Sequence, residues 1–243
     1  MELSPLPLRA VTERTAEPLP RDRWPATVPA VAQLLDEGFD FGQATVLVGE
    51  NGAGKSTLVE GLAMAFGISG EGGSPNTRRE TRPSESPLWR HLQLNRGPGA
   101  ARFGYFLRAE TMHGLYTFLE ENPKGPNQPP DVTFHELSHG ESFLALLESR
   151  FRRQGLWLLD EPESALSFSG CIALLQHLRD LLSDERNQVI LSTHSPLLAA
   201  LPGADLVEVG DWGLRRTTWD DSTLVRTWRD FLSSPAAFLR LLA

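Results

Sequence analysis

The stretch that decides the fold of this chain is Gly49-Glu50-Asn51-Gly52-Ala53-Gly54-Lys55-Ser56-Thr57. It matches the pattern G-x-x-x-x-G-K-[ST] and stands between an apolar run at 44–48 and a segment at 55–66 whose apolar residues recur at helical spacing. The glycines let consecutive backbone N–H groups point inward, and the following helix directs its positive end at the same place. The stretch therefore predicts a phosphate-binding loop between a strand and a helix.

Two side chains of this loop have distinct expected roles. Lys55 is expected to reach the β- and γ-phosphate oxygens of a nucleotide as a compact charge, and the Ser56 hydroxyl to bind Mg²⁺. The remaining expected nucleotide contacts come from small side chains and the backbone: Gly49, Asn51, Gly52, Ala53, Gly54 and Thr57. The alternative is a glycine-rich turn without a ligand, and the strand and helix on either side argue against it.

A second signal is an apolar run, 156–159, that ends in the two acids Asp160 and Glu161. Both carboxylates are expected at the sheet edge where the phosphates lie. Asp160 is expected to hold Mg²⁺ through its water shell, and Glu161 to polarise the water that attacks the γ-phosphate. Alone, an acidic pair after a strand is equally typical of a plain turn. Together with Lys55 it indicates a hydrolytic site.

Strand and helix patterns alternate along the chain. The expected strands are 44–48, 102–107, 156–159 and 188–192, and the expected helices are 55–66, a helix ending near 121, 138–153 and 169–182. This alternation predicts an α/β fold with a mainly parallel central sheet flanked by helices.

The segments outside this alternation are less regular. The first forty residues predict only an irregular strand or two, and 67–86 and 122–131 predict loops. The stretch 212–219 is expected to add a hairpin or an edge strand. The tail from residue 223 predicts two amphipathic helical segments separated by a proline.

Composition excludes several classes of protein. The 243 residues are 40% hydrophobic and 22% charged, which is typical of a globular protein and not of a disordered or collagenous one. No apolar run approaches the length of about 18 residues that spans a bilayer, so we expect a cytoplasmic protein without membrane insertion. The single cysteine, Cys171, is expected to be a small buried hydrophobe. The net charge of -8 argues against broad capture of nucleic acid.

Three further segments follow the order found in ABC-type ATPases. Leu137-Ser138-His139-Gly140-Glu141-Ser142 resembles the LSGGQ signature, 160–166 resembles the extended Walker B segment with its D-loop, and 192–196 is similar to the switch-histidine segment. Segments 104–110 and 138–143 are similar to those of soluble, stand-alone ATPases related to RecF and to structural-maintenance-of-chromosomes heads. The resemblance covers about 44–201.

The resemblance implies one ABC-type ATPase domain over 1–243, a P-loop NTPase whose mainly parallel sheet has an antiparallel edge. Its core spans about 44–201, a helical signature lobe at about 76–153 is inserted in the core, and a helical tail covers about 222–243.

The resemblance also implies a mechanism that uses ATP and Mg²⁺. His194 would contact the γ-phosphate and help to hold the water on Glu161. The Ser138 hydroxyl and the Gly140 N–H would meet the γ-phosphate of an opposite subunit, which requires an ATP-dependent homodimer. Ser138 with Glu141 also forms a capping box, so a plain helix start is the alternative reading.

The sequence departs from the family pattern at several positions. His139 replaces a glycine, Glu141 a glutamine and Ser167 the usual acid after the D-loop. The signature and the communication between two sites therefore depend on residues that the family does not normally use.

Two further roles transfer only by position. Glu110 stands where the family has a metal-sensing glutamine, and the alternative is a helix-starting acid. Trp24 lies upstream of the loop where the family places an adenine-stacking aromatic, and the alternative is a buried tryptophan.

Seven arginines against two glutamates make the Arg78–Arg108 segment the one basic block of the chain. The arginines of this basic block are Arg78, Arg79, Arg82, Arg90, Arg96, Arg102 and Arg108. They are expected to contact a partner protein or nucleic acid, or to form a solvated face. The interval from Lys55 to Ser138 is too short for a coiled-coil arm.

These observations predict an ATP-hydrolysing enzyme that acts as a soluble, dimerising switch, with DNA maintenance or phage defence as its setting. The alternative is the nucleotide-binding subunit of an ABC transporter whose membrane subunit is a separate chain. A binding module without catalysis is disfavoured because Asp160, Glu161 and His194 are all present.

Overall fold

A computed structural model describes residues 5–73, 86–109 and 153–240 of the chain, together with 142, 144 and 147. The structural findings concern these residues.

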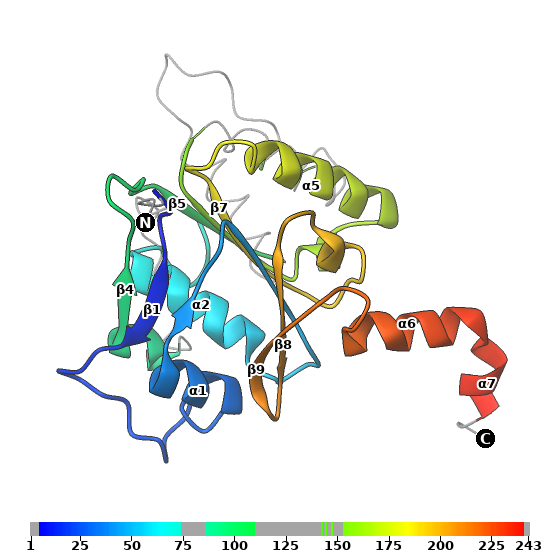
Figure 1. The fold of residues 1–243 in the computed structure, drawn as a ribbon, viewed down its shortest axis with the longest axis horizontal. Helices are drawn as coiled ribbons and strands as arrows, with labels where there is room; N and C mark the ends of the chain where they lie inside the picture. Colours follow the sequence, from blue (N-terminus) through cyan, green and yellow to red (C-terminus); the bar gives the residue numbers. More distant parts are fainter. Residues whose placement is uncertain are drawn as a thin grey trace.

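The centre of the fold is a six-stranded sheet with the strand order β5-β6-β7-β3-β8-β9 (Figure 1). Its strands are β3 (Ala44–Val48), β5 (Gly104–Arg108), β6 (Leu156–Asp160), β7 (Gln188–Thr193), β8 (Asp205–Gly210) and β9 (Gly213–Thr217). The first five are parallel, and β9 pairs antiparallel with β8. The predicted parallel sheet with an antiparallel edge is confirmed.

Helices cover both faces of this sheet. The helices that pack on it are α1 (Pro29–Glu37), α2 (Lys55–Phe66) and α5 (Phe168–Leu181). Neighbouring strand residues point to opposite faces: Leu158 packs with α1 and α2, and Leu159 packs with α5. Cys171 of α5 is buried and free, as expected, and burial raises the pKa of its thiol. Both faces are therefore hydrophobic cores.

The N-terminal part is more regular than the sequence predicted. A second, antiparallel sheet has the order β2-β1-β4, with β1 (Ala10–Glu13), β2 (Phe39–Asp40) and β4 (Leu92–Asn95). A 3-10 segment, η1 (Pro87–His91), precedes β4. Residues 29–37 form helix α1, which the sequence analysis did not predict: Pro29 begins it, and Val31 and Leu34 are buried against the core.

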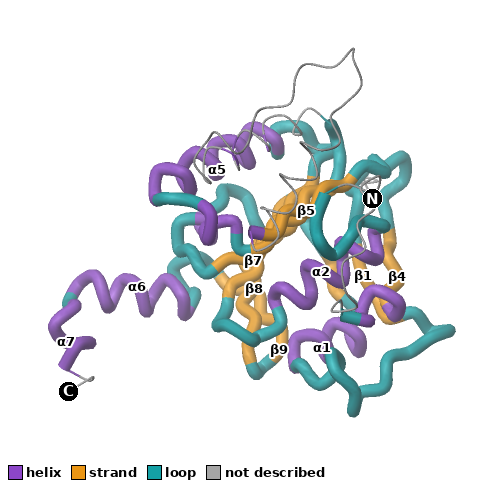
Figure 2. The backbone as a smooth tube through the Cα atoms, turned by 180° about the vertical axis from the view of Figure 1, so that it is seen from behind, coloured by secondary structure: helices purple, strands orange, loops and turns teal. Residues whose placement is uncertain are grey.

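The C-terminal part forms an arm. Helices α6 (Thr223–Ser233) and α7 (Pro235–Leu239) follow the β8–β9 hairpin and extend away from the sheet, as both views show (Figures 1 and 2). Two 3-10 segments, η4 (Pro162–Ala165) and η5 (Leu198–Ala200), follow β6 and β7. The predicted hairpin and the two helical segments are confirmed. Of the expected signature helix, only Ser142, Leu144 and Leu147 are described, and all three are helical.

Candidate active site

The predicted phosphate-binding loop joins β3 to α2. Gly49 has a φ of 155°, and a Cβ on it would lie 2.1 Å from the Val209 carbonyl oxygen of β8. Gly54 has a φ of 105° and stands at the N-cap of α2, so that the helix begins at Lys55. The loop therefore opens at the N-terminus of a helix, where unpaired backbone N–H groups favour an anion.

Lys55 is buried at the base of this loop. Its Nζ donates to the carbonyl oxygens of Gly49 at 2.9 Å and Glu50 at 3.1 Å, and it lies 2.9 Å from Nε2 of His194. Burial lowers the pKa of the Lys55 ammonium, and the carboxylates of Glu161 and Asp160 oppose that change. Two carbonyl oxygens and the His194 ring nitrogen therefore surround the Lys55 ammonium.

Asp160 lies at the end of β6 and is 3% exposed. Its Oδ1 accepts a hydrogen bond from the Ser56 hydroxyl at 3.0 Å and a second one from the Ser192 hydroxyl. Burial raises the pKa of the Asp160 carboxyl, whereas Ser192, Arg108 and Ser56 lower it.

These oxygens fit Mg²⁺, which prefers hard oxygen ligands and few protein side chains because it keeps several waters. Within the described part of the chain, no group of three or more His, Cys, Asp and Glu side chains could hold a metal. Ser56 and Asp160 are the described residues that would hold Mg²⁺, because their side-chain oxygens lie 3.0 Å apart, and nucleotide oxygens and water would complete its coordination.

Glu161 and His194 come from neighbouring strand ends. The backbone N–H of Glu161 donates to the Ser192 carbonyl at 3.0 Å, and Glu161 adopts the left-handed conformation with a φ of 50°. The backbone N–H of His194 donates to the Glu163 carboxylate. His194 Nε2 lies 3.1 Å from Glu161 Oε1. The strained backbone at Glu161 is typical of a functional position, and it brings this carboxylate to the loop.

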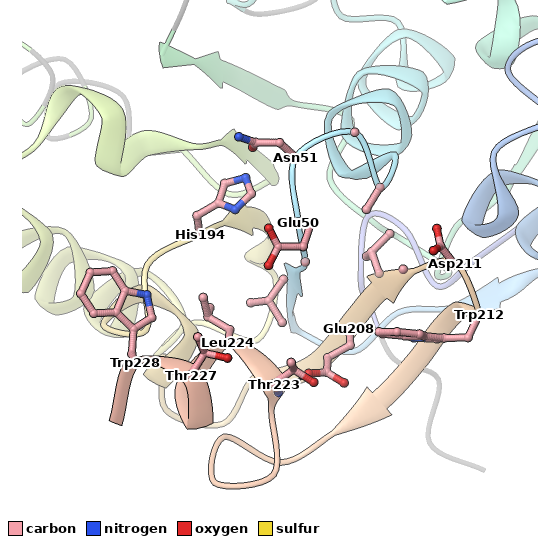
Figure 3. Close-up of a pocket in the computed structure, with 16 residues that line it drawn as sticks. Glu50, Asn51, His194, Glu208, Asp211, Trp212, Thr223, Leu224, Thr227 and Trp228 are labelled. Atoms are coloured by element: carbon pink, nitrogen blue, oxygen red, sulfur yellow. Dashed lines mark hydrogen bonds between the residues drawn. The ribbon is translucent and has the colours of Figure 1, made fainter. Parts of the chain in front are cut away.

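A cavity of about 540 Å³ lies beside the phosphate-binding loop. The loop and His194 form one side, and the β8–β9 turn and α6 form the other, as Figure 3 shows. Trp212 and Trp228, both about half exposed, line it together with the buried Glu208. The sequence analysis missed all three. The amphipathic pattern of 223–233 signals a helix but does not indicate what that helix faces.

Among the described residues, the structure does not bring the remaining predicted site residue, Trp24, to this cavity. Trp24 is 54% exposed, so it is not a buried tryptophan, and it does not line the cavity. Val28, four residues after Trp24, packs against Gly54 of the loop. Glu110, Ser138 and Gly140 lie outside the described residues.

Of the four described arginines of the basic block, Arg90, Arg96 and Arg102 are exposed and Arg108 is partly buried. Arg96 packs over the Phe66 ring at 4.0 Å, and burial lowers the pKa of its guanidinium. Arg108 pairs with Glu60 at 2.6 Å in the interior. These two arginines are engaged with the protein itself.

The sequence matches the protein family described as "AAA domain, putative AbiEii toxin, Type IV TA system" over residues 44–128 and 84–200. This match spans more than half of the chain and contains the phosphate-binding loop, Asp160, Glu161 and His194. The chain belongs to this family of ABC-type P-loop ATPases. It is an enzyme that binds and hydrolyses ATP.

Several curated relatives of this ABC-type ATPase are named as import or export ATP-binding proteins. It is 32% identical over 189 residues to the aliphatic sulfonates import ATP-binding protein SsuB 2 of Rhodococcus jostii, which covers 75% of this chain and 73% of the relative. It is also 32% identical over 181 residues to the cytochrome c biogenesis ATP-binding export protein CcmA 1 of Salmonella typhimurium, covering 68% and 80%.

Solved structures similar to this ATPase include the dimeric bacterial ABC transporter cassette MJ0796, with a TM-score of 0.46, 14% identity and coverage of 75% and 88% of the two chains. The SMC head domain from Thermotoga maritima is similar with a TM-score of 0.39, 15% identity and coverage of 74% and 92%. Among the described helices of this ATPase, none is long and apolar enough to cross a membrane.

Proposed function

We propose that this ATPase is an ATP-dependent switch that closes as a homodimer around two ATP molecules. The observation that carries ATP hydrolysis in this proposal is the convergence of Lys55, Glu161 and His194 on the phosphate-binding loop, with His194 within 3.1 Å of both partners. Lys55 exchanges its contacts with the loop for β- and γ-phosphate oxygens. Glu161 polarises the attacking water, and His194 contacts the γ-phosphate.

Ser56 and Asp160 hold Mg²⁺ in this proposal, and Glu110 is a further candidate ligand. Bound Mg²⁺ neutralises charge on the phosphates. Ser192 keeps Oδ1 of Asp160 directed toward the Ser56 hydroxyl, because both hydroxyls donate to that oxygen.

The dimer brings Ser138 and Gly140 of one subunit to the γ-phosphate held by the other. The proposed dimer is supported by the similarity of 137–142 to the signature segment. It is also supported by the family order of 137–142, 160–166 and 192–196 along the chain. The active site is then complete only when two subunits meet.

Protein concentration tests this proposal. The rate per subunit at saturating ATP is expected to rise with protein concentration and then level off, because two subunits assemble one active unit. A Ser138→Ala variant is expected to keep ATP binding and lose the rate. A rate per subunit that is constant from nanomolar to micromolar protein, unchanged by Ser138→Ala, would overturn the dimer.

We also propose that Trp24 stacks on the adenine ring. Its half-exposed ring and the contact of nearby Val28 with Gly54 support this role. Trp24→Ala is expected to weaken ADP binding by about tenfold, while Trp24→Phe retains most of the affinity. Trp228→Ala, at a tryptophan that lines the cavity, is the matched control, and an equal or larger loss there would overturn the assignment.

The names of the curated relatives favour a second function, the nucleotide-binding subunit of a transporter with a separate membrane chain. A soluble, cytoplasmic switch is expected to remain in the soluble fraction of its native cells during ATP turnover. Retention in the membrane fraction, with release by detergent, would favour the transporter subunit. DNA maintenance or phage defence remains a prediction of the sequence.

A further inference from the structure

Arg108 lies directly beside the proposed metal site. It is the last residue of β5, and the parallel register pairs it with Asp160, the last residue of β6. Arg108 Nε lies 3.5 Å from Asp160 Oδ2, while its NH1 is 2.6 Å from Glu60 Oε2 of α2. The Arg108 guanidinium therefore stands between two carboxylates.

The burial of these groups makes the arrangement electrostatically important. The side chain of Asp160 is 3% exposed, that of Glu60 10% and that of Arg108 23%. A buried carboxylate without a compensating charge is costly. Among the described residues, Arg108 forms the ion pair with Asp160 on its Oδ2 side.

The two oxygens of Asp160 therefore have different surroundings. Oδ1 accepts from Ser56 and Ser192, and Oδ2 faces Arg108. Oε2 of Glu60 pairs with the Arg108 guanidinium on the side away from Asp160. Oε1 of Glu60 accepts a hydrogen bond from the Ser86 backbone N–H at 2.9 Å. The position of Arg108 is thus determined by groups on three parts of the chain.

We propose that Arg108 is a positioning residue that stands in for the divalent cation at Asp160 when the metal is absent. This inference rests on the proposed Mg²⁺ site of Ser56 and Asp160. Arg108 stabilises the metal-free form more than the metal-bound form, because a divalent cation relieves the same buried charge. Arg108 therefore weakens divalent-cation binding, and it keeps Asp160 oriented before the cation arrives.

Two substitutions have opposite expected effects on cation affinity. Arg108→Gln removes the competing charge, so divalent cations bind more tightly. Glu60→Gln removes the carboxylate that pairs with the guanidinium at 2.6 Å, so more of the Arg108 charge acts on the metal site and divalent cations bind more weakly. Arg108→Lys keeps a cation and is expected to resemble the wild type more closely than Arg108→Gln does.

The experiment uses Mn²⁺ as the probe, with free Mn²⁺ followed by electron paramagnetic resonance in the presence of saturating ADP and a protein-free ADP blank. We expect the Mn²⁺ affinity to rise about three- to tenfold in Arg108→Gln and to fall by a similar factor in Glu60→Gln. Arg90→Gln, in the same basic block but exposed on the 3-10 segment η1, is the control and leaves the affinity unchanged.

Thermal unfolding gives a second readout. Arg108→Gln is expected to lower the melting temperature in EDTA, and Mn²⁺ with ADP is expected to raise it by more than in the wild type. If Arg108→Gln does not fold, Glu60→Gln alone decides through its weaker Mn²⁺ binding. Unchanged or weaker Mn²⁺ binding in Arg108→Gln, or unchanged or tighter binding in Glu60→Gln, would overturn the inference.

The proposed metal site is tested separately by Ser56→Ala and Asp160→Asn. If the wild type binds no Mn²⁺ beyond the ADP blank, the metal site fails, and the role of Arg108 toward it fails too. If the wild type binds Mn²⁺ and these two variants do not, the metal site stands, and the Arg108 and Glu60 variants decide the inference.

Discussion

Nε2 of His194 lies 2.9 Å from Nζ of Lys55 and 3.1 Å from Oε1 of Glu161. One ring nitrogen cannot accept a proton from the ammonium and donate one to the carboxylate at the same time. The two other protons of Lys55 go to carbonyl oxygens of the loop, so Nε2 is its third acceptor. Lys55 and Glu161 therefore share the same ring nitrogen of His194, and we expect a phosphate that binds Lys55 to leave Nε2 available to the γ-phosphate and to Glu161.

His194→Ala is expected to reduce kcat by about a hundredfold, because it removes a group that acts on the γ-phosphate and on the water at Glu161. The affinity for ATP is expected to change by less than about threefold, since Lys55 and the loop backbone hold the phosphates. Steady-state kinetics with equilibrium binding separate the two effects. A large loss of affinity with an unchanged kcat would contradict the assigned role.

Gly49→Ala is expected to be far more destabilising than Gly52→Ala. A Cβ on Gly49 lies 2.1 Å from a backbone oxygen of β8, whereas one on Gly52, at a φ of 81°, meets no atom within 4 Å. We expect a loss of about 3 kcal/mol or more at Gly49 and about 1 kcal/mol at Gly52, where only backbone strain remains. Urea unfolding of the ligand-free proteins measures both. Equal losses would contradict the close packing of the loop on β8.

Glu208 lines the cavity beside the phosphate-binding loop and is hydrogen-bonded to the first residue of α6 in the C-terminal arm. It is buried, and it accepts hydrogen bonds from Arg215 at 2.6 Å and from the Thr223 backbone N–H at the start of α6. Burial raises the pKa of Glu208, but these hydrogen bonds together outweigh it, and the pKa falls below its ordinary value of 4.5. The ionised side chain therefore stabilises the folded state.

Glu208→Gln is expected to lower the free energy of unfolding at pH 7 by about 1–3 kcal/mol. The wild-type advantage is fully present above pH 4.5, the ordinary pKa, and declines as the pH falls through the lower folded-state pKa. Asp205→Asn is the matched control, because the Asp205–Arg216 pair is about half exposed and contributes at most about 0.5 kcal/mol. A loss for Glu208→Gln that does not diminish on acidification would contradict this account.

The parts of the fold that follow from local pattern were predictable. Helix α2 begins at Lys55 and ends at Phe66 as expected, because left-handed glycines stand at both of its caps. Helix α1 was missed because its nine residues have no side-chain cap at the N-terminus and follow a proline-rich stretch. Its stability comes from packing on the sheet, which a local pattern does not reveal.

Part of the active site could likewise be predicted from the sequence, and part could not. The order of the segments predicted that Lys55, Glu161 and His194 meet, because each follows a parallel strand and these strands end at one edge. The role of Arg108 could not be predicted. Its partners Glu60 and Asp160 are about fifty residues away in either direction, so the sequence placed it in a basic surface block.

The light-scattering mass of a Glu161→Gln variant, measured with and without Mg·ATP, tests whether ATP drives formation of the homodimer. The substitution keeps ATP binding and removes the carboxylate that polarises water, so a closed ATP state accumulates. We predict a shift from 26.9 kDa to twice that mass with ATP, and no shift with ADP or in Lys55→Ala. A mass that stays at 26.9 kDa while ATP is bound would contradict the claim.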